Sequence, residues 1–208
     1  MDGFEFLLLL LAWAIGGASP GPATLAIAGT SMERGRAAGL SVAAGIVIGS
    51  ASWGLAAAFG MSALILANVW LVEILRYVGA AYLLFLAFKA GNSALSDKPL
   101  AQVSAGRGGI RRLFVKGLLL HLTNPKAIFG WGAMFAVIIP AGSDPNILVH
   151  VFLPLITVSC IVFFGYALLF STAGFILGYQ RMRRGFEGAF ALLFGIAGVK
   201  ILTTRFAP

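Results

Sequence analysis

Two short segments place helix-breaking and polar residues inside long hydrophobic runs of this chain. The first is GASPGPATLA, residues 17 to 26, and the second is HLTNPKAIFGW, residues 121 to 131. Proline removes a backbone donor and leaves the carbonyl group four residues earlier without its helical partner. In a bilayer, such a break is tolerated only where the backbone lines a cavity or is buried by protein. The two segments are therefore the candidate binding site.

The chemistry that these segments offer is the binding of an anionic group. Asn124 before Pro125 predicts a cap and the first residue of a new helix, and Ser19 before Pro20 predicts the same arrangement again. The two new helices would point their positive ends at the middle of the membrane, which suits a carboxylate. We assign substrate binding to eight residues: Ser19, Pro20, Gly21, Pro22, Thr24, Asn124, Pro125 and Lys126.

Lys126 is the charged member of this set. It lies about 13 residues into its hydrophobic run, or roughly 20 Å from the start at 1.5 Å per residue. A lysine at that depth costs about 2.5–3.5 kcal/mol on insertion scales, so it needs a reason to be there. Lys126 either attracts an anionic group of a substrate or pairs with carbonyl groups freed by the break. The sequence leaves both interpretations open.

Four further polar residues are candidates for coupling or gating. His121 either relays a proton, with a substrate carboxylate between it and Lys126, or stays neutral and donates to a freed carbonyl. Ser50, a polar residue within the second hydrophobic run, is a second coupling candidate. Glu73 and Arg76, three residues apart, form either an ion pair at the membrane interface or a gate.

The composition requires a membrane to surround these elements. Of 208 residues, 60% are hydrophobic and only 11% are charged, against about 25% in soluble domains. The mean hydropathy is +0.96. The net charge of +8 falls in loops between hydrophobic runs, so nucleic acid is not an expected partner. The single cysteine, Cys160, excludes an internal disulfide, and the chain shows no cluster of metal ligands, so we expect no metal site and no cofactor.

We predict an all-α integral membrane protein with six transmembrane helices in one domain, residues 1 to 208. The expected spans are about 4–30, 38–67, 69–90, 113–139, 147–178 and 185–203. With six spans, the lysines and arginines of the loops all lie on one side, which identifies that side as the cytoplasm. Both termini are therefore predicted to lie outside the cytoplasm.

The two halves of the chain resemble each other. Residues 79–85 read GAAYLLF and residues 188–194 read GAFALLF, and Pro20 and Pro125 lie at corresponding depths. We predict one repeat over about 1–91, a cytoplasmic linker over about 92–112 and a second repeat over about 113–208. Because each repeat has three spans, the repeats are inverted, with helices 1 and 4 broken at mid-membrane. That arrangement is typical of secondary transporters.

The segments ASPGPA, GRAAGLSVAAGIVIGSASW and LTNPKAIFGW resemble the sequence pattern of the LysE/RhtB family of amino-acid exporters. The resemblance covers nearly the whole chain. It implies a multi-pass protein of the bacterial inner membrane that exports amino acids or related metabolites from the cytoplasm by alternating access, and it is not an enzyme. Export would be coupled to protons or to the membrane potential. The expected partners are a small-molecule substrate and the bilayer, and a homodimer is left open.

One position departs from the family pattern. Family members often carry an acidic residue where this chain has Ser50, so we expect no carboxylate in the middle of any span. This weakens an acid-mediated proton relay and a strongly cationic substrate. Two other functions stay open: a metal-ion exporter of related architecture, and a non-transporting membrane scaffold or assembly factor.

Overall fold

The computed structural model is a bundle of helices, and it describes residues 3–67, 69–95, 109–138 and 146–203. Within these ranges it contains helices and no strand. The helices are α1 (Gly3–Ala18), α2 (Pro22–Arg34), α3 (Arg36–Ala67), α4 (Val69–Leu95), α5 (Ile110–Leu122), α6 (Pro125–Ile138), α7 (Asn146–Leu169) and α8 (Ala173–Thr203). The all-helical class is as predicted from the sequence.

The helices follow the expected spans in order, but the boundary between the last two differs, because α7 ends at Leu169 and α8 begins at Ala173. Spans 1 and 4 are the broken pairs α1/α2 and α5/α6, and the other four spans are α3, α4, α7 and α8. Two of the described helices are long and apolar enough to cross a membrane, over residues 36–60 and 149–169. The α1/α2 pair, bent by 58°, makes a third candidate if it counts as one span. Six spans in two inverted repeats therefore stays a prediction.

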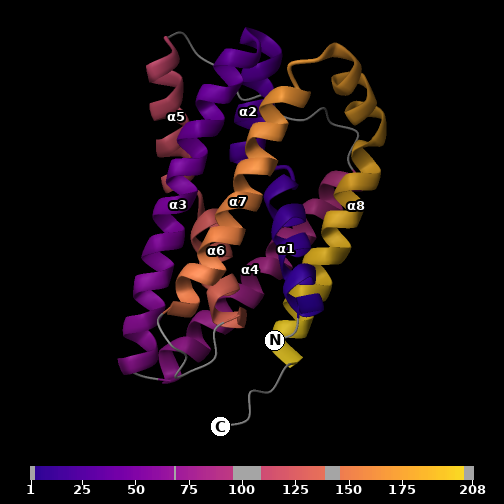
Figure 1. The fold of residues 1–208 in the computed structure, drawn as a ribbon. Helices are drawn as coiled ribbons and strands as arrows, with labels where there is room; N and C mark the ends of the chain where they lie inside the picture. Colours follow the sequence, from indigo (N-terminus) through magenta and orange to yellow (C-terminus); the bar gives the residue numbers. More distant parts are fainter. Residues whose placement is uncertain (1–2, 68, 96–108, 139–145, 204–208) are drawn as a thin grey trace.

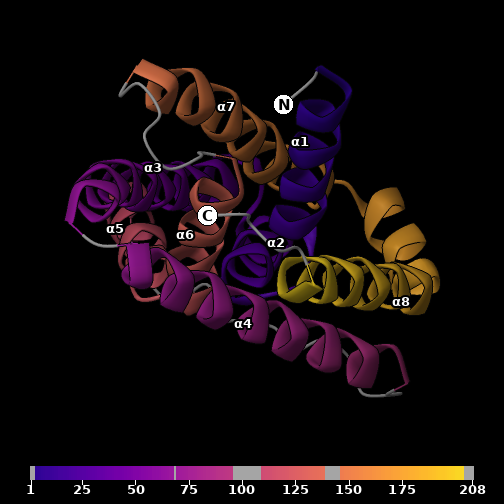
Figure 2. The same cartoon turned by 90° about the horizontal axis from the view of Figure 1, so that it is seen from below.

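The packing places α2 and α6 toward the middle of the bundle (Figure 2). Around them, α3 packs along α5 and α7, and α4 packs along α8. The start of α1 and the end of α8 lie at the same end of the bundle (Figure 1). The opposite end carries the start of α5, the α7–α8 turn and the turn from α2 to α3. In that last turn Gly35 has a φ of 81°, a left-handed conformation that favours glycine.

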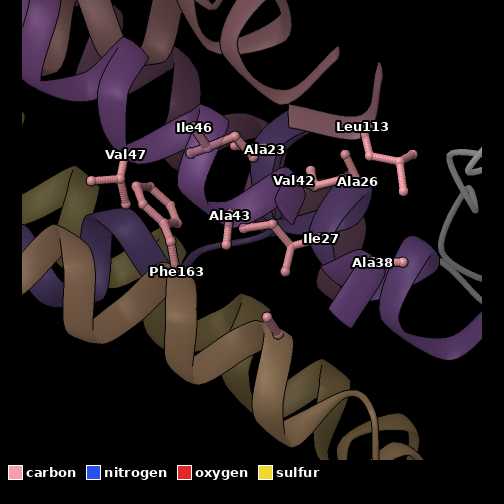
Figure 3. Packing of buried hydrophobic residues seen from close by; sticks show 11 residues of the cluster. Ala23, Ala26, Ile27, Ala38, Val42, Ala43, Ile46, Val47, Leu113 and Phe163 are labelled. Atoms are coloured by element: carbon pink, nitrogen blue, oxygen red, sulfur yellow. The ribbon is translucent and has the colours of Figure 1, made fainter. Parts of the chain in front are cut away.

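Small residues let α3 approach its neighbours closely. A Cβ added at Gly45 would lie 2.0 Å from the carbonyl oxygen of Phe114, and one at Gly117 would lie 2.3 Å from that of Val42. Gly45 and Gly49, four residues apart on α3, both pack against α5. The core beside this contact joins α2, α3, α5 and α7 through alanine, valine and isoleucine together with Leu113 and Phe163 (Figure 3).

Candidate functional site

The first break consists of the three residues between α1 and α2. Gly21 caps α2 with extended backbone (φ −168°), and Pro22 is the first helical residue. The Thr24 hydroxyl accepts a hydrogen bond from the Gly21 backbone N–H at 3.0 Å and contacts the Ser19 carbonyl oxygen at 3.2 Å. The helix begins next to Gly21, as expected, but the expected roles of Ser19 as the cap and Pro20 as the first helical residue were wrong. Pro22, rather than Pro20, is the structural counterpart of Pro125.

The second break is shorter and has the predicted chemistry. Only Thr123 and Asn124 separate α5 from α6, and Pro125 is the first residue of α6. The Asn124 side-chain oxygen accepts a hydrogen bond from the Lys126 backbone N–H at 3.1 Å, as a helix cap does. Asn124 is buried, as are Ser19 and Thr24 of the first break.

Lys126 brings the two breaks together. Its Nζ donates a hydrogen bond to the Ser19 carbonyl oxygen at 3.1 Å and another to the Ser19 hydroxyl. A Cβ added at Gly21 would lie 3.7 Å from the same Nζ, so Gly21 leaves room for the lysine. The ammonium group also lies 5.9 Å from the centre of the Phe194 ring on α8, within cation–π range. Among the described residues, both hydrogen-bond acceptors of this amine belong to Ser19, and these acceptors carry no charge.

The carbonyl groups freed by the breaks are bound by side chains of neighbouring helices. The Tyr166 hydroxyl on α7 donates to the Ala18 carbonyl oxygen, which ends α1. The Trp53 indole N–H on α3 donates to the Leu122 carbonyl oxygen at 3.2 Å, at the end of α5. Buried backbone groups need such partners. Neither interaction was predicted from the sequence, where the only signal was a polar aromatic residue within a hydrophobic run.

The two coupling candidates occupy different environments. Ser50 is buried and accepts a hydrogen bond from the Trp131 indole N–H at 3.0 Å, so it orients a core aromatic residue. His121 is 4% exposed, packs edge-on against Phe163 with ring centres 5.6 Å apart, and its Nδ1 has no hydrogen-bond partner among the described residues. The alternative in which His121 Nδ1 donates to a freed carbonyl is therefore not seen.

Glu187 is a buried acid that the sequence reading misplaced. We expected span 6 to run over about 185–203, with no carboxylate in the middle of any span. The start was wrong, because α8 begins at Ala173, and Glu187 lies well within this helix, where it is 3% exposed. The available signal was its spacing to Phe190 and Phe194, which places all three on one helical face.

Two other predicted features receive less support. Glu73 and Arg76 lie on α4, but their side chains are outside the described residues, so the proposed pair or gate stays a prediction. In the described part of the chain, no three His, Cys, Asp or Glu residues are grouped so that they could hold a metal ion.

Comparison with known proteins gives this site its context. The family model described as "LysE type translocator" matches residues 14–205. The chain belongs to the LysE type translocator family. Proteins of this family are translocators, so the chain is a transporter rather than an enzyme. The resemblance seen in the sequence motifs is thereby confirmed.

Relatives of this LysE family member include proteins named as exporters. The threonine efflux protein of Escherichia coli strain K12 is 28% identical over 204 residues, which cover 96% of this chain and 98% of the relative. That of Salmonella typhi is 29% identical over 192 residues, covering 90% and 92%. An uncharacterized membrane protein of Pseudomonas aeruginosa is 32% identical over 211 residues, covering 97% and 92%. No solved structure matches the chain.

Proposed function

We propose that this LysE family member is a secondary transporter that exports amino acids from the cytoplasm by alternating access. The observation that carries the proposal is the contact between the Lys126 ammonium group and Ser19. It places a positive charge at the point where two broken helices meet. Broken helices with their N-termini near a substrate site are a recurring device of secondary transporters.

The geometry of this point favours a carboxylate ligand. Lys126 follows the first residue of α6, so its charge adds to the partial positive charge of that helix N-terminus. Its present partners are a carbonyl oxygen and a hydroxyl group, which are weaker acceptors than a carboxylate. A substrate carboxylate would therefore take the place of the Ser19 oxygens. Since two relatives are named for threonine efflux, neutral amino acids such as threonine are the first candidates.

The arrangement of helices supports the orientation and repeats that we propose. Basic residues at the ends of α2, α3 and α5 gather at the end of the bundle opposite to the start of α1 and the end of α8 (Figure 1): Arg34, Arg36, Arg111 and Arg112. This favours a cytoplasmic location for that end and an outer location for both termini, in a bacterial inner membrane. The equivalent helices α3 and α7 contact each other, and so do α4 and α8, an arrangement that a twofold axis between two repeats would produce.

Coupling to protons is assigned to His121 in this proposal. It is buried five residues before Lys126, and its Nδ1 is without a partner among the described residues. An imidazole can take up and release a proton, so this group is the candidate proton carrier of a transport cycle. A substrate carboxylate next to Lys126 would favour the protonated form, which links proton movement to cargo.

The test is transport in inverted vesicles that contain the overexpressed protein. Radiolabelled amino acids, including threonine, are offered with a pH gradient, with a membrane potential, and with neither. We expect uptake of at least one neutral amino acid into the inverted vesicles above that of vesicles without the protein. If no amino acid of the panel is transported under any condition, the proposed function is wrong.

A further inference from the structure

The buried carboxylate of Glu187 is the feature of the molecule that the proposed function does not yet use. It is 3% exposed, and one of its oxygens accepts a hydrogen bond from the Ser93 hydroxyl of α4 at 3.0 Å. An ionisable residue buried in a membrane helix is costly, and such residues commonly mark a substrate or ion pathway. Of the acidic side chains that the structure describes, Glu187 is the one in the buried class.

Glu187 faces the same space as Lys126. Phe194, whose ring lies under the Lys126 ammonium group, is seven residues further along α8, which is two helical turns on the same face. Phe190 lies between them, and both phenylalanines pack near Ile15 and Ala18 at the end of α1. The face of α8 that carries Glu187 therefore borders the first break.

The charges of the two residues also act on each other. Glu187 lies close enough to Lys126 to interact with it electrostatically, in the favourable sense. A second ammonium group, that of Lys89, is one turn from Ser93 on α4, and it is exposed. The Glu187 carboxylate and the Lys126 ammonium group thus form a pair of opposite charges near Phe194 and the first break.

We propose that Glu187 is a specificity-determining residue whose carboxylate binds the α-ammonium group of the exported amino acid, while Lys126 binds its carboxylate. The inference rests on the proposed function and names its substrate class: zwitterionic α-amino acids with an uncharged side chain. A zwitterion presents both charges on adjacent carbon atoms, so it satisfies both residues at once. A carboxylate without the amino group would make no charged contact with Glu187 and would bind more weakly.

The experiment measures binding by isothermal titration calorimetry on the purified full-length protein in detergent. The probes are L-threonine and 3-hydroxybutyrate, which is threonine without its α-amino group. Wild type is expected to bind threonine more tightly than 3-hydroxybutyrate. Glu187→Gln should weaken threonine binding by at least about tenfold, because a charge-assisted hydrogen bond is lost. Binding of 3-hydroxybutyrate should not change. Glu187→Asp, which keeps the charge, should give an intermediate loss.

The matched control is Glu33→Gln at the exposed end of α2, which should leave both affinities unchanged. Equal losses for both probes in Glu187→Gln and Glu187→Asp, or no loss for either, would show that Glu187 only joins α4 to α8, and the inference would be overturned. If wild type binds neither probe and transports no amino acid of the panel, the proposed function itself fails. That result differs from one in which wild type binds threonine and Glu187→Gln leaves the ratio of the threonine and 3-hydroxybutyrate affinities unchanged, which would overturn only the role of Glu187.

Discussion

The two helix breaks differ in where their groups find partners. The second break is held mainly by its own sequence: Asn124 caps α6 and Pro125 begins it. The first break is one residue longer and is capped by a glycine, which has no side chain. Its carbonyl groups accept hydrogen bonds from the nearby Thr24 hydroxyl and from two distant side chains. Tyr166 donates to the Ala18 carbonyl oxygen, and Lys126 donates to that of Ser19.

This difference assigns different tasks to the breaks. The second break presents a fixed charge, because Lys126 sits in the first turn of a well-capped helix. The first break supplies acceptors and, at Gly21, the room that the lysine side chain needs. Its contacts are long-range, so they can be exchanged when a substrate arrives, whereas the local cap of α6 persists. The four predictions that follow test this division.

Removing the charge should have the largest effect. Lys126→Met is expected to insert and fold, because it removes a costly buried charge. Export of carboxylate-bearing substrates should fall by about 10- to 100-fold, as expected for loss of a charge-assisted contact. Lys126→Arg should restore only part of it, because a rigid guanidinium group does not replace an ammonium group. Transport in inverted vesicles measures each variant at matched expression.

The control for this variant is Lys116→Met, which removes a lysine of the neighbouring helix α5. It should transport at the wild-type rate. Wild-type export by Lys126→Met would mean that the lysine is structural and that the substrate site lies elsewhere.

Loosening the first break should have the next largest effect. Tyr166→Phe removes the hydroxyl group that donates to the Ala18 carbonyl oxygen, and a buried acceptor left alone costs about 1–3 kcal/mol. We expect a lower melting temperature in detergent together with slower transport. Trp53→Phe, which removes the donor to Leu122 at the second break, is the matched variant and should lower the melting temperature with a smaller effect on transport. Equal transport defects in the two variants would contradict the division of tasks.

Much of this architecture follows from local chemistry and was therefore predictable. Proline, glycine and asparagine act on their own backbone, so the sequence located both breaks and the Asn124 cap. The partners of the breaks come from residues 69 to 148 positions away, such as Trp53 for Leu122 and Tyr166 for Ala18, and no local pattern identifies them. The start of α8 was misjudged for a similar reason. The charged stretch around Arg184 resembled a loop but is helical, and this error placed Glu187 at the edge of the span.

Weakening the second break should cost stability more than transport. Asn124→Ala removes the cap of α6, and loss of such a cap costs about 0.5–2 kcal/mol. We expect a modest drop in melting temperature, with Lys126 kept near Ser19 by its own hydrogen bonds. Asn124→Asp and Asn124→Ser, which are good caps, should recover most of the stability. A transport loss in Asn124→Ala as large as that of Lys126→Met would indicate that Asn124 itself binds substrate.

The smallest change in stability is expected for His121→Gln, which tests whether the titratable group beside the second break couples transport to protons. Glutamine keeps a polar side chain of similar size beside Phe163 but cannot take up a proton, so the melting temperature should change little. Transport driven by a pH gradient should be lost, whereas transport driven by a membrane potential alone should remain. A residue that only supported the fold would reduce transport under both driving forces alike, so the comparison separates coupling from a structural role. Unchanged pH-driven transport in this variant would remove His121 from the mechanism and leave the second break with a single functional charge, that of Lys126.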